Sequence, residues 1–251
     1  MDAVRRRQYL EALGVTTWER RDAAVVDAPV PPPEAHVAVA EVVEVAHVRA
    51  PRAMERVSAP VDWAALKAAV AGCTKCRLCE TRTQTVFGVG PENASLMVVG
   101  EGPGAVEDAQ GEPFVGRAGK LLDEMLKAIG RSRKTNTYVA NTVKCRPPNN
   151  REPAEDETEA CRPYLEQQLR HVKPKLIVAL GRVAAQRLLV TDTPIGKMRG
   201  RTYAWGPERT PLMVTYHPAY LLRSPAEKSK SWEDLKAIHR FLNAPSRAPS
   251  A

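Results

Sequence analysis

Four short, largely apolar runs constrain the fold of this 251-residue chain more than any other feature. Apolar runs of this length that alternate with amphipathic helical segments are typical of βαβ units, in which parallel strands lie buried between helices. The runs are residues 96–99, 138–143, 176–180 and 212–216, and helical spacing of apolar residues is seen at 62–72, 118–129, 155–169, 183–189 and 231–242. We therefore expect an α/β fold, a three-layer α/β/α sandwich around a mainly parallel four-stranded sheet.

The residues that follow the expected strands are unusual. A glycine-rich segment occupies 101–104, a segment rich in basic and amide side chains occupies 144–150, and Gly181 and His217 each follow a further strand directly. In parallel α/β sheets the functional site lies outside the carboxyl ends of the strands. The sequence therefore predicts a site built from these four segments.

Residues 1–61 differ in composition from the rest of the chain. More than half of the stretch 23–60 is alanine or valine, and it has no aromatic residue on which a core could form. We expect a short helix at 3–12 and a disordered linker, then a folded domain at 62–243 and a disordered tail at 244–251. No apolar run approaches the roughly 18 residues of a membrane span, and no secretory signal is recognisable, so we expect a cytoplasmic protein.

The formal net charge is +8 at pH 7, and the excess lies in residues 62–251 because residues 1–61 are close to neutral. An excess of basic side chains attracts polyanions, of which nucleic acid is the commonest. A basic protein without a polyanionic partner is the alternative that charge alone leaves open.

The spacing of the five cysteines indicates a metal site. Their odd number in a chain expected to be cytoplasmic argues against a disulfide framework. Cys73 and Cys76 form a C-x2-C pair, and with Cys145 and Cys161 they offer four thiolates, which suit zinc or an iron–sulfur cluster. The wide spacing of the second pair favours iron–sulfur over a zinc ribbon, and Cys79 is the spare cysteine. Five unrelated buried cysteines are the alternative.

Three side chains could recognise a planar base. Phe114, between glycines in a loop, could stack on a base or belong to the core. Asn141 interrupts an apolar strand; its amide donor and acceptor match those on the edge of uracil, although a turn hydrogen bond would also satisfy it. His217 could donate to a developing oxyanion or be structural.

The segment 100–104 lacks the glycine patterns of phosphate-binding loops. The carboxylates of Glu101, Glu107 and Asp108 would also repel a phosphate. Carboxylates beside exposed backbone N–H groups instead suit the positioning of a water next to a bound neutral group. Glu101 and Glu107 are both candidates for that task, and the sequence does not separate them.

Together these residues resemble the family 4 uracil-DNA glycosylases, the iron–sulfur members of the uracil glycosylase superfamily. The likeness covers about residues 62–243. Its motifs are Cys73-Thr-Lys-Cys76, Val98-Val-Gly-Glu-Gly-Pro-Gly104, Pro113-Phe-Val-Gly-Arg-Ala-Gly119, Asn141-Thr-Val-Lys-Cys-Arg-Pro-Pro148 and His217-Pro-Ala-Tyr-Leu-Leu-Arg223. The resemblance implies a three-layer α/β/α fold, a [4Fe–4S] cluster and excision of uracil from single- or double-stranded DNA, which starts base excision repair.

The resemblance also implies roles for individual residues. The cluster ligands would be Cys73, Cys76, Cys145 and Cys161, without Cys79. The backbone N–H of Gly102, the ring of Phe114, the amide of Asn141 and the imidazole of His217 would contact uracil, the last at O2. Leu221, at the apex of a loop, would fill the space that the flipped base leaves, and the residues placed around the DNA would be Arg146, Arg151 and Arg223.

Two functions of other kinds remain open. A catalytically silent iron–sulfur or zinc domain that binds DNA, for example beside a polymerase, would use the same charge and cysteines. A relative that captures the sugar covalently would need a histidine in the loop after Asn141, where this chain has Cys145. We expect a monomer, and the helix expected at 3–12 could dock on a protein partner.

Overall fold

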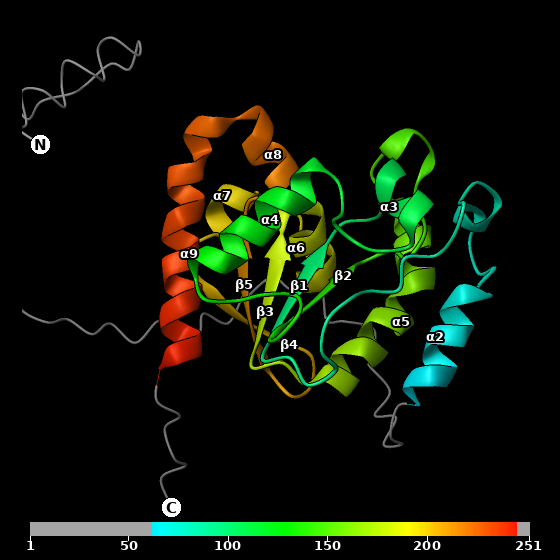
Figure 1. Ribbon diagram of the computed structural model, residues 1–251, viewed down its shortest axis with the longest axis horizontal. Coiled ribbons are helices and arrows are strands. Elements are labelled where there is room, and N and C mark those ends of the chain that lie inside the picture. Colours follow the sequence, from blue (N-terminus) through cyan, green and yellow to red (C-terminus); the bar gives the residue numbers. More distant parts are fainter. Residues whose placement is uncertain (1–61, 245–251) are drawn as a thin grey trace, which may run out of the picture. The chain divides into compact units, whose positions relative to one another are not determined.

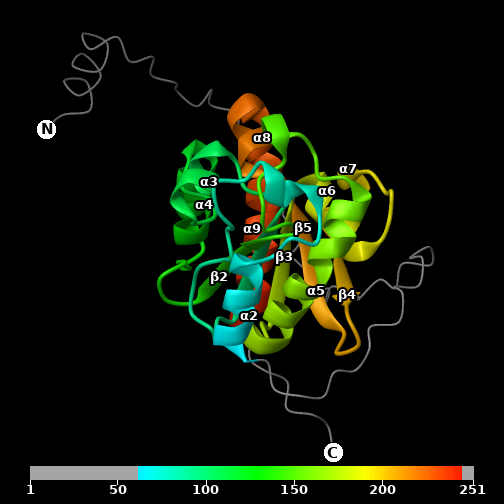
Figure 2. The same cartoon turned by 90° about the vertical axis from the view of Figure 1, so that its right-hand side faces the viewer.

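The computed structural model describes residues 62–244; the helix, linker and tail expected at 1–61 and 245–251 lie outside the described residues. A five-stranded sheet of order β2-β1-β3-β5-β4 lies between two layers of helices (Figure 1, Figure 2). The strands are β1 (Leu96–Gly100), β2 (Thr137–Asn141), β3 (Leu176–Leu180), β4 (Thr202–Trp205) and β5 (Thr210–Thr215). The predicted three-layer α/β/α class is confirmed.

The five helices expected between residues 62 and 242 are present within a few residues of their predicted positions. The α-helices are α2 (Trp63–Ala71), α3 (Ala105–Gln110), α4 (Arg117–Ala128), α5 (Glu155–Val172), α6 (Gly181–Leu189), α7 (Ile195–Met198), α8 (Pro218–Arg223) and α9 (Lys228–Asn243). The described residues also contain short 3-10 helices at η1 (Arg77–Glu80), η2 (Pro148–Asn150) and η3 (Pro225–Glu227). Within residues 62–244 no helix is both long and apolar enough to cross a membrane.

The predicted number of strands was wrong by one. The pairs β1–β2, β1–β3 and β3–β5 are parallel, whereas β4 adds an antiparallel edge strand to β5. The four residues of β4 do not form an apolar run, and its last two are only half buried. An edge strand needs burial on fewer sides than a central one, so its sequence carries a weaker signal.

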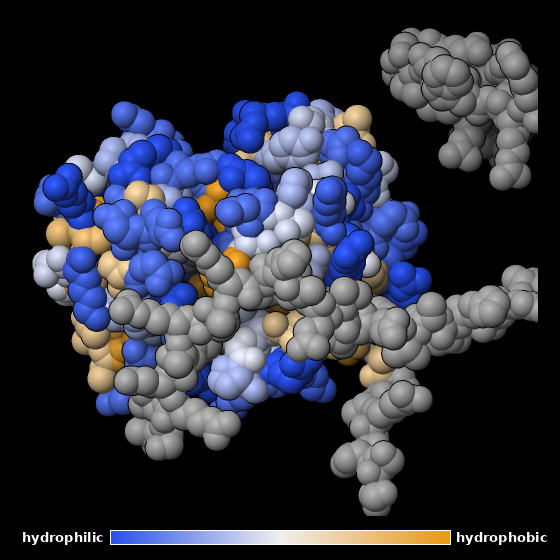
Figure 3. All heavy atoms as spheres, turned by 180° about the vertical axis from the view of Figure 1, so that it is seen from behind, coloured by the Kyte–Doolittle hydropathy of each residue, from blue (hydrophilic) through white to orange (hydrophobic). Residues whose placement is uncertain are grey.

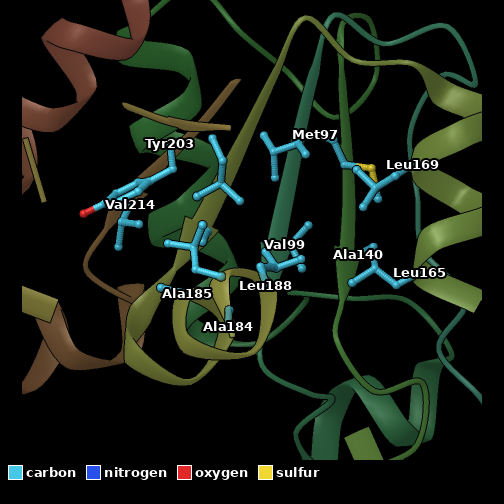
Figure 4. Close-up of a cluster of buried hydrophobic side chains, with 14 of the residues drawn as sticks. Met97, Val99, Ala140, Leu165, Leu169, Ala184, Ala185, Leu188, Tyr203 and Val214 are labelled. Atoms are coloured by element: carbon cyan, nitrogen blue, oxygen red, sulfur yellow. The ribbon is translucent and has the colours of Figure 1, made fainter. Parts of the chain in front are cut away.

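The core has two parts because side chains alternate across the sheet. Met97 and Val99 of β1 pack with α5, α6 and α7 on one face (Figure 4). Leu96 and Val98 pack with α4, α8 and α9 on the other face. Hydrophilic residues dominate the visible surface in Figure 3. The sheet is thus buried on both faces, and its carboxyl edge is left for a site.

Candidate active site

A pocket of about 790 Å³ opens at the carboxyl edge of the sheet. Residues that follow β1, β2, β3 and β5 line it, and the arrows of β1 and β3 in Figure 1 point to this end of the molecule, where α3 and α8 lie. The strand ends that the sequence singled out therefore form one pocket, which we call the carboxyl-edge pocket. The predicted site residues that line it are Glu101, Gly102, Glu107, Phe114, Asn141, Arg151, His217 and Arg223.

Asn141 and Phe114 meet above Gly100, the last residue of β1. A Cβ at Gly100 would lie 2.5 Å from both the Asn141 Oδ1 and the Phe114 Cζ, so only glycine allows the two side chains to approach this closely. The Asn141 Oδ1 is buried and has no hydrogen-bond partner among the described residues. An unpaired buried polar atom costs about 1–3 kcal/mol, which marks this oxygen as the place for a donor on a ligand.

The imidazole of His217 is a neutral hydrogen-bond donor. His217 is the N-cap of α8, and its Nδ1 accepts the backbone N–H of Ala219 at 3.1 Å. In a neutral ring the proton must then be on Nε2. Burial, and secondly the charge of Arg223, lowers the pKa of His217 to about 4. Gly181 leaves room for this side chain, since a Cβ there would lie 2.9 Å from the Cβ of His217.

The two candidate carboxylates have different surroundings. The Glu107 Oε1 accepts the backbone N–H groups of Val115 and Gly116, each at 3.0 Å, so this oxygen holds the loop that carries Phe114. Glu101 lines the pocket, and burial raises its pKa to about 7, helped by the charge of Glu152. At neutral pH Glu101 is therefore present as a mixture of acid and carboxylate.

The three arginines predicted to lie around the DNA differ in what they contact. Arg223 is exposed at the end of α8 and lines the pocket. Arg151 donates to both carboxylate oxygens of Glu157, at 2.8 and 2.6 Å, and is tied to the start of α5. Arg146 does not line the pocket; its Nε donates to the Oδ1 of Asn150 at 2.8 Å, and Asn150 does line it.

The placement of Leu221 at an exposed loop apex was wrong. Residues 218–223 form α8, and Leu221 is 1% exposed within the core under that helix. Its neighbours Tyr220 and Leu222 are 36% and 37% exposed, and of these two Tyr220 lines the pocket. Helical periodicity turns adjacent residues to different sides, which a loop interpretation of this motif ignores.

Four cysteines come together in a second cavity, which we call the cysteine cavity. It is lined by Cys73, Cys76, Cys145 and Cys161, the four predicted ligands, and Cys79 is not among its lining residues. Within residues 62–244 no three His, Cys, Asp or Glu side chains are grouped closely enough for one metal ion. The four thiols that the sequence predicts as ligands therefore line one cavity.

Hydrogen-bond donors point at two of these sulfur atoms. The Nη1 of Arg82 donates to the Sγ of Cys145 at 3.0 Å, and the backbone N–H of Lys144 donates to the Sγ of Cys161 at 3.3 Å. Burial raises the pKa of the Cys161 thiol to about 11, so binding of a metal group must displace protons here. Donors to sulfur stabilise thiolates, as a metal site requires.

Lys144 links the two sites, and sequence reasoning missed it. Its side chain is fully buried, and its Nζ donates to the backbone oxygen of Asn141 at 2.9 Å and to the Oε1 of Gln168 at 2.6 Å. The signal that could have found it is its position between Asn141 and Cys145, two residues that the sequence analysis had already selected. Sequence reasoning also missed Glu152 and Arg182, which form an ion pair and both line the carboxyl-edge pocket.

Comparison with known proteins identifies the family. Residues 87–236 match the model of the uracil DNA glycosylase superfamily. The chain is similar to type-4 uracil-DNA glycosylases of Sulfurisphaera tokodaii (43% identical, covering 72% of this chain and 86% of the relative) and Archaeoglobus fulgidus (44%, covering 67% and 87%). A third, from Pyrobaculum aerophilum, is 40% identical over 73% of this chain and 98% of the relative.

The chain belongs to the type-4 uracil-DNA glycosylases. In this glycosylase the superfamily match contains the strand ends that form the carboxyl-edge pocket, together with Cys145 and Cys161. Cys73 and Cys76 precede the match. The pocket is therefore the part of the molecule shared with the wider superfamily, and half of the cysteine set lies outside that part.

Proposed function

We propose that the carboxyl-edge pocket binds a uracil flipped out of DNA and holds it while water attacks C1′ of its sugar. By its family the protein is a uracil-DNA glycosylase, a DNA repair enzyme that hydrolyses the N-glycosidic bond of uracil and leaves an abasic site. Flipping is needed because a duplex hides both C1′ and the edge of the base. The observation that carries the proposal is the buried, unpaired Asn141 Oδ1 beside the ring of Phe114.

Recognition of uracil follows from the groups around that oxygen. The Asn141 Oδ1 accepts the N3–H of uracil, and the amide nitrogen donates to O4. Cytosine has an acceptor at N3 and a donor at C4, so it opposes both groups. The ring of Phe114 stacks on the base, and the backbone N–H of Gly102 donates to it. A site built on such paired contacts rejects a base that leaves its buried groups unpaired.

Bond cleavage requires charge stabilisation on one side of the sugar and a water on the other. As the bond breaks, negative charge develops on O2, and the Nε2–H of neutral His217 donates to that oxygen without having to lose a proton. Glu101 positions the water, because Glu107 is occupied by the loop at 114–116. Glu101 performs this task as a carboxylate, and so at pH values above its raised pKa.

DNA is held by basic side chains at and near the pocket. Arg223 lies at its rim, and Arg146 acts through the loop that contains Asn150. Arg151 contributes by fixing the start of α5 through Glu157. Tyr220, exposed at the same rim, is the side chain that contacts the bases next to the flipped nucleotide. Its ring lies 5.1 Å from that of Tyr216, which also lines the pocket.

The four thiols of the cysteine cavity hold a [4Fe–4S] cluster. The proposal is supported by the four thiols lining one cavity and by Arg82 and Lys144, which donate to two of the sulfur atoms. Such a cluster would be held by Cys73 and Cys76 between α2 and η1, by Cys145 after β2 and by Cys161 of α5. Hydrolysis of an N-glycosidic bond needs no electron transfer, so a structural task is sufficient.

The proposal is tested with the full-length protein and three labelled oligonucleotides that differ at one position, carrying uracil, thymine or cytosine. Alkali cleaves the strand wherever a base has been removed. We expect a shortened strand from the uracil substrate alone. If protein that shows the brown absorbance of its cluster yields no shortened strand from uracil in single-stranded DNA or opposite guanine, the proposal is wrong, and the DNA-binding domain without catalysis replaces it.

A further inference from the structure

We propose that Arg133 is a positioning residue of this glycosylase. It holds the backbone of Phe114 in the conformation that aims the aromatic ring into the carboxyl-edge pocket. The inference rests on the proposed function, in which that ring stacks on uracil. Arg133 lies in the loop between α4 and β2 and is not among the residues that line the pocket.

The backbone of Phe114 is strained. Its φ is 56°, in the left-handed region that an aromatic side chain rarely adopts. Such a conformation persists only where the surrounding structure enforces it, and it is concentrated at functional sites. Gly119, in the first turns of α4, lies directly against Phe114, since a Cβ there would overlap the Phe114 carbonyl oxygen.

Arg133 holds this strained segment through hydrogen bonds to its carbonyl groups. Its Nη2 donates to the carbonyl oxygen of Phe114 at 2.9 Å, and its Nη1 donates to that of Pro113 at 2.8 Å. Its Nε donates to the Oδ1 of Asp123 at 2.8 Å, and the Arg133 side chain is only 11% exposed. Two neighbouring carbonyl groups are thus held by one planar guanidinium, a geometry that lysine cannot reproduce.

Glu107 also holds this segment through hydrogen bonds. Its Oε1 accepts the N–H groups of Val115 and Gly116, the two residues after Phe114. The carbonyl groups before the turn are therefore held by a cation and the N–H groups after it by an anion. Of the two, Glu107 also lines the pocket, so Arg133 is the residue whose effect on the reaction must pass through Phe114.

A double-mutant cycle tests this directly, because two residues that act as one unit show non-additive effects. In the full-length holoenzyme we expect Arg133→Met to lower kcat/KM for a single-stranded uracil oligonucleotide by about tenfold, the order of effect set by backbone strain of this kind. In a Phe114→Ala background the same substitution should cost less than about twofold. Arg133→Lys should lower kcat/KM nearly as much as Arg133→Met, because a lysine ammonium cannot hold both carbonyl groups as the planar guanidinium does.

Arg131 offers a matched control. It lies in the same loop and is likewise partly buried, and its Nη1 donates to the Oγ of Ser95 at 2.8 Å rather than to the 113–116 segment. Arg131→Met should leave kcat/KM within about twofold in both backgrounds. If Arg133→Met does not fold, Asp123→Asn replaces it as the test, because it weakens the ion pair that holds the Arg133 guanidinium. This substitution should lower kcat/KM less than Arg133→Met, and the loss should disappear in the Phe114→Ala background.

Three outcomes separate the possibilities. Equal losses from Arg133→Met in both backgrounds, or full activity of Arg133→Lys, overturn the inference and leave Arg133 a purely structural residue. An unchanged Phe114→Ala enzyme overturns the stacking role on which the inference rests. A wild-type protein that releases no uracil overturns the proposed function itself.

Discussion

The carboxyl-edge pocket and the cysteine cavity both include residues of one short segment, 141–145, yet they are opposite environments. In the pocket, Asn141 has an unpaired oxygen and His217 is held neutral, so the groups there are prepared for a ligand that arrives and leaves. In the cysteine cavity, donors from Arg82 and Lys144 already point at the thiols. The segment 141–145 thus begins with the residue that we propose to recognise uracil and ends with a proposed cluster ligand, Cys145.

The contrast has a structural consequence. Lys144 lines the cysteine cavity, and its Nζ donates to the backbone oxygen of Asn141. Whatever holds Cys145 and Cys161 in place therefore also fixes the peptide of the residue that we propose to recognise uracil. The two regions have different chemistry but are connected through Lys144. Substitutions in one region can therefore be tested for their effect on the other.

The largest effect is expected from His217→Ala. Loss of a preorganised donor to a developing oxyanion costs about 100- to 1,000-fold in kcat. Since the imidazole does not contact the cysteine cavity, the iron content should equal that of the wild type. Single-turnover excision and iron analysis measure both quantities, with His239→Ala on α9 as the control. A His217→Ala enzyme that keeps its kcat would remove His217 from the mechanism.

Cys161→Ser, unlike His217→Ala, should lower the iron content and the stability of the protein. It removes one proposed ligand, so iron content should fall to near zero and the melting temperature by roughly 10 °C, because metal binding contributes to folding. Cys79→Ser is the matched control and should retain its iron, since Cys79 does not line the cavity. Iron and sulfide analysis with thermal melts decides the matter. Equal iron loss in the two variants would contradict the ligand assignment.

The pH profile sharpens the account of the pocket. With its pKa raised to about 7, Glu101 is protonated at lower pH, so kcat/KM should fall about tenfold per unit as the pH decreases below 7. His217, with its pKa lowered to about 4, should add no inflection between pH 5 and 8. Glu101→Gln should abolish the slope as well as most of the activity. A slope that survives in Glu101→Gln must come from another group.

The smallest effect is expected at the rim. Tyr220→Ala should lower excision from duplex DNA about fivefold and from single strands less than twofold, because only a duplex has a stack to be repaired. Leu222→Ala is a close control, since Leu222 has nearly the same exposure on the same helix but does not line the pocket. If Leu222→Ala is the variant that loses duplex activity, the rim contact belongs to that residue.

Much of the fold was predictable from local patterns, because each central strand is a buried apolar run and each long helix has a periodic apolar face. Edge strand β4 was missed since Thr202–Trp205 is short and half exposed. The rule that parallel strands end at one edge placed His217 beside the segments that follow β1 and β2, whereas Phe114 lies between α3 and α4 and was not placed by that rule. The boundaries of the folded domain, the cytoplasmic location and a partner for residues 3–12 stay predictions.

What the sequence could not provide were contacts between residues that are distant along the chain. Arg133 reaches back to Phe114, and Lys144 reaches forward to Gln168; neither has a local signature. Leu221 was misplaced for a different reason: the motif was interpreted as a loop, whereas its residues form α8 and Leu221 is buried. Packing, which depends on the whole fold, decides which residue of a short helix faces solvent.

The most direct test of the central claim changes the base rather than the protein. An oligonucleotide with 3-methyluracil keeps O2 and O4 but lacks the N3–H that the Asn141 Oδ1 would accept. We expect the wild type to excise uracil at least about 100-fold faster than 3-methyluracil, and Asn141→Ala to reduce that ratio to nearly one while lowering uracil excision. Equal excision of the two bases by the wild-type enzyme would contradict the claim that Asn141 recognises uracil.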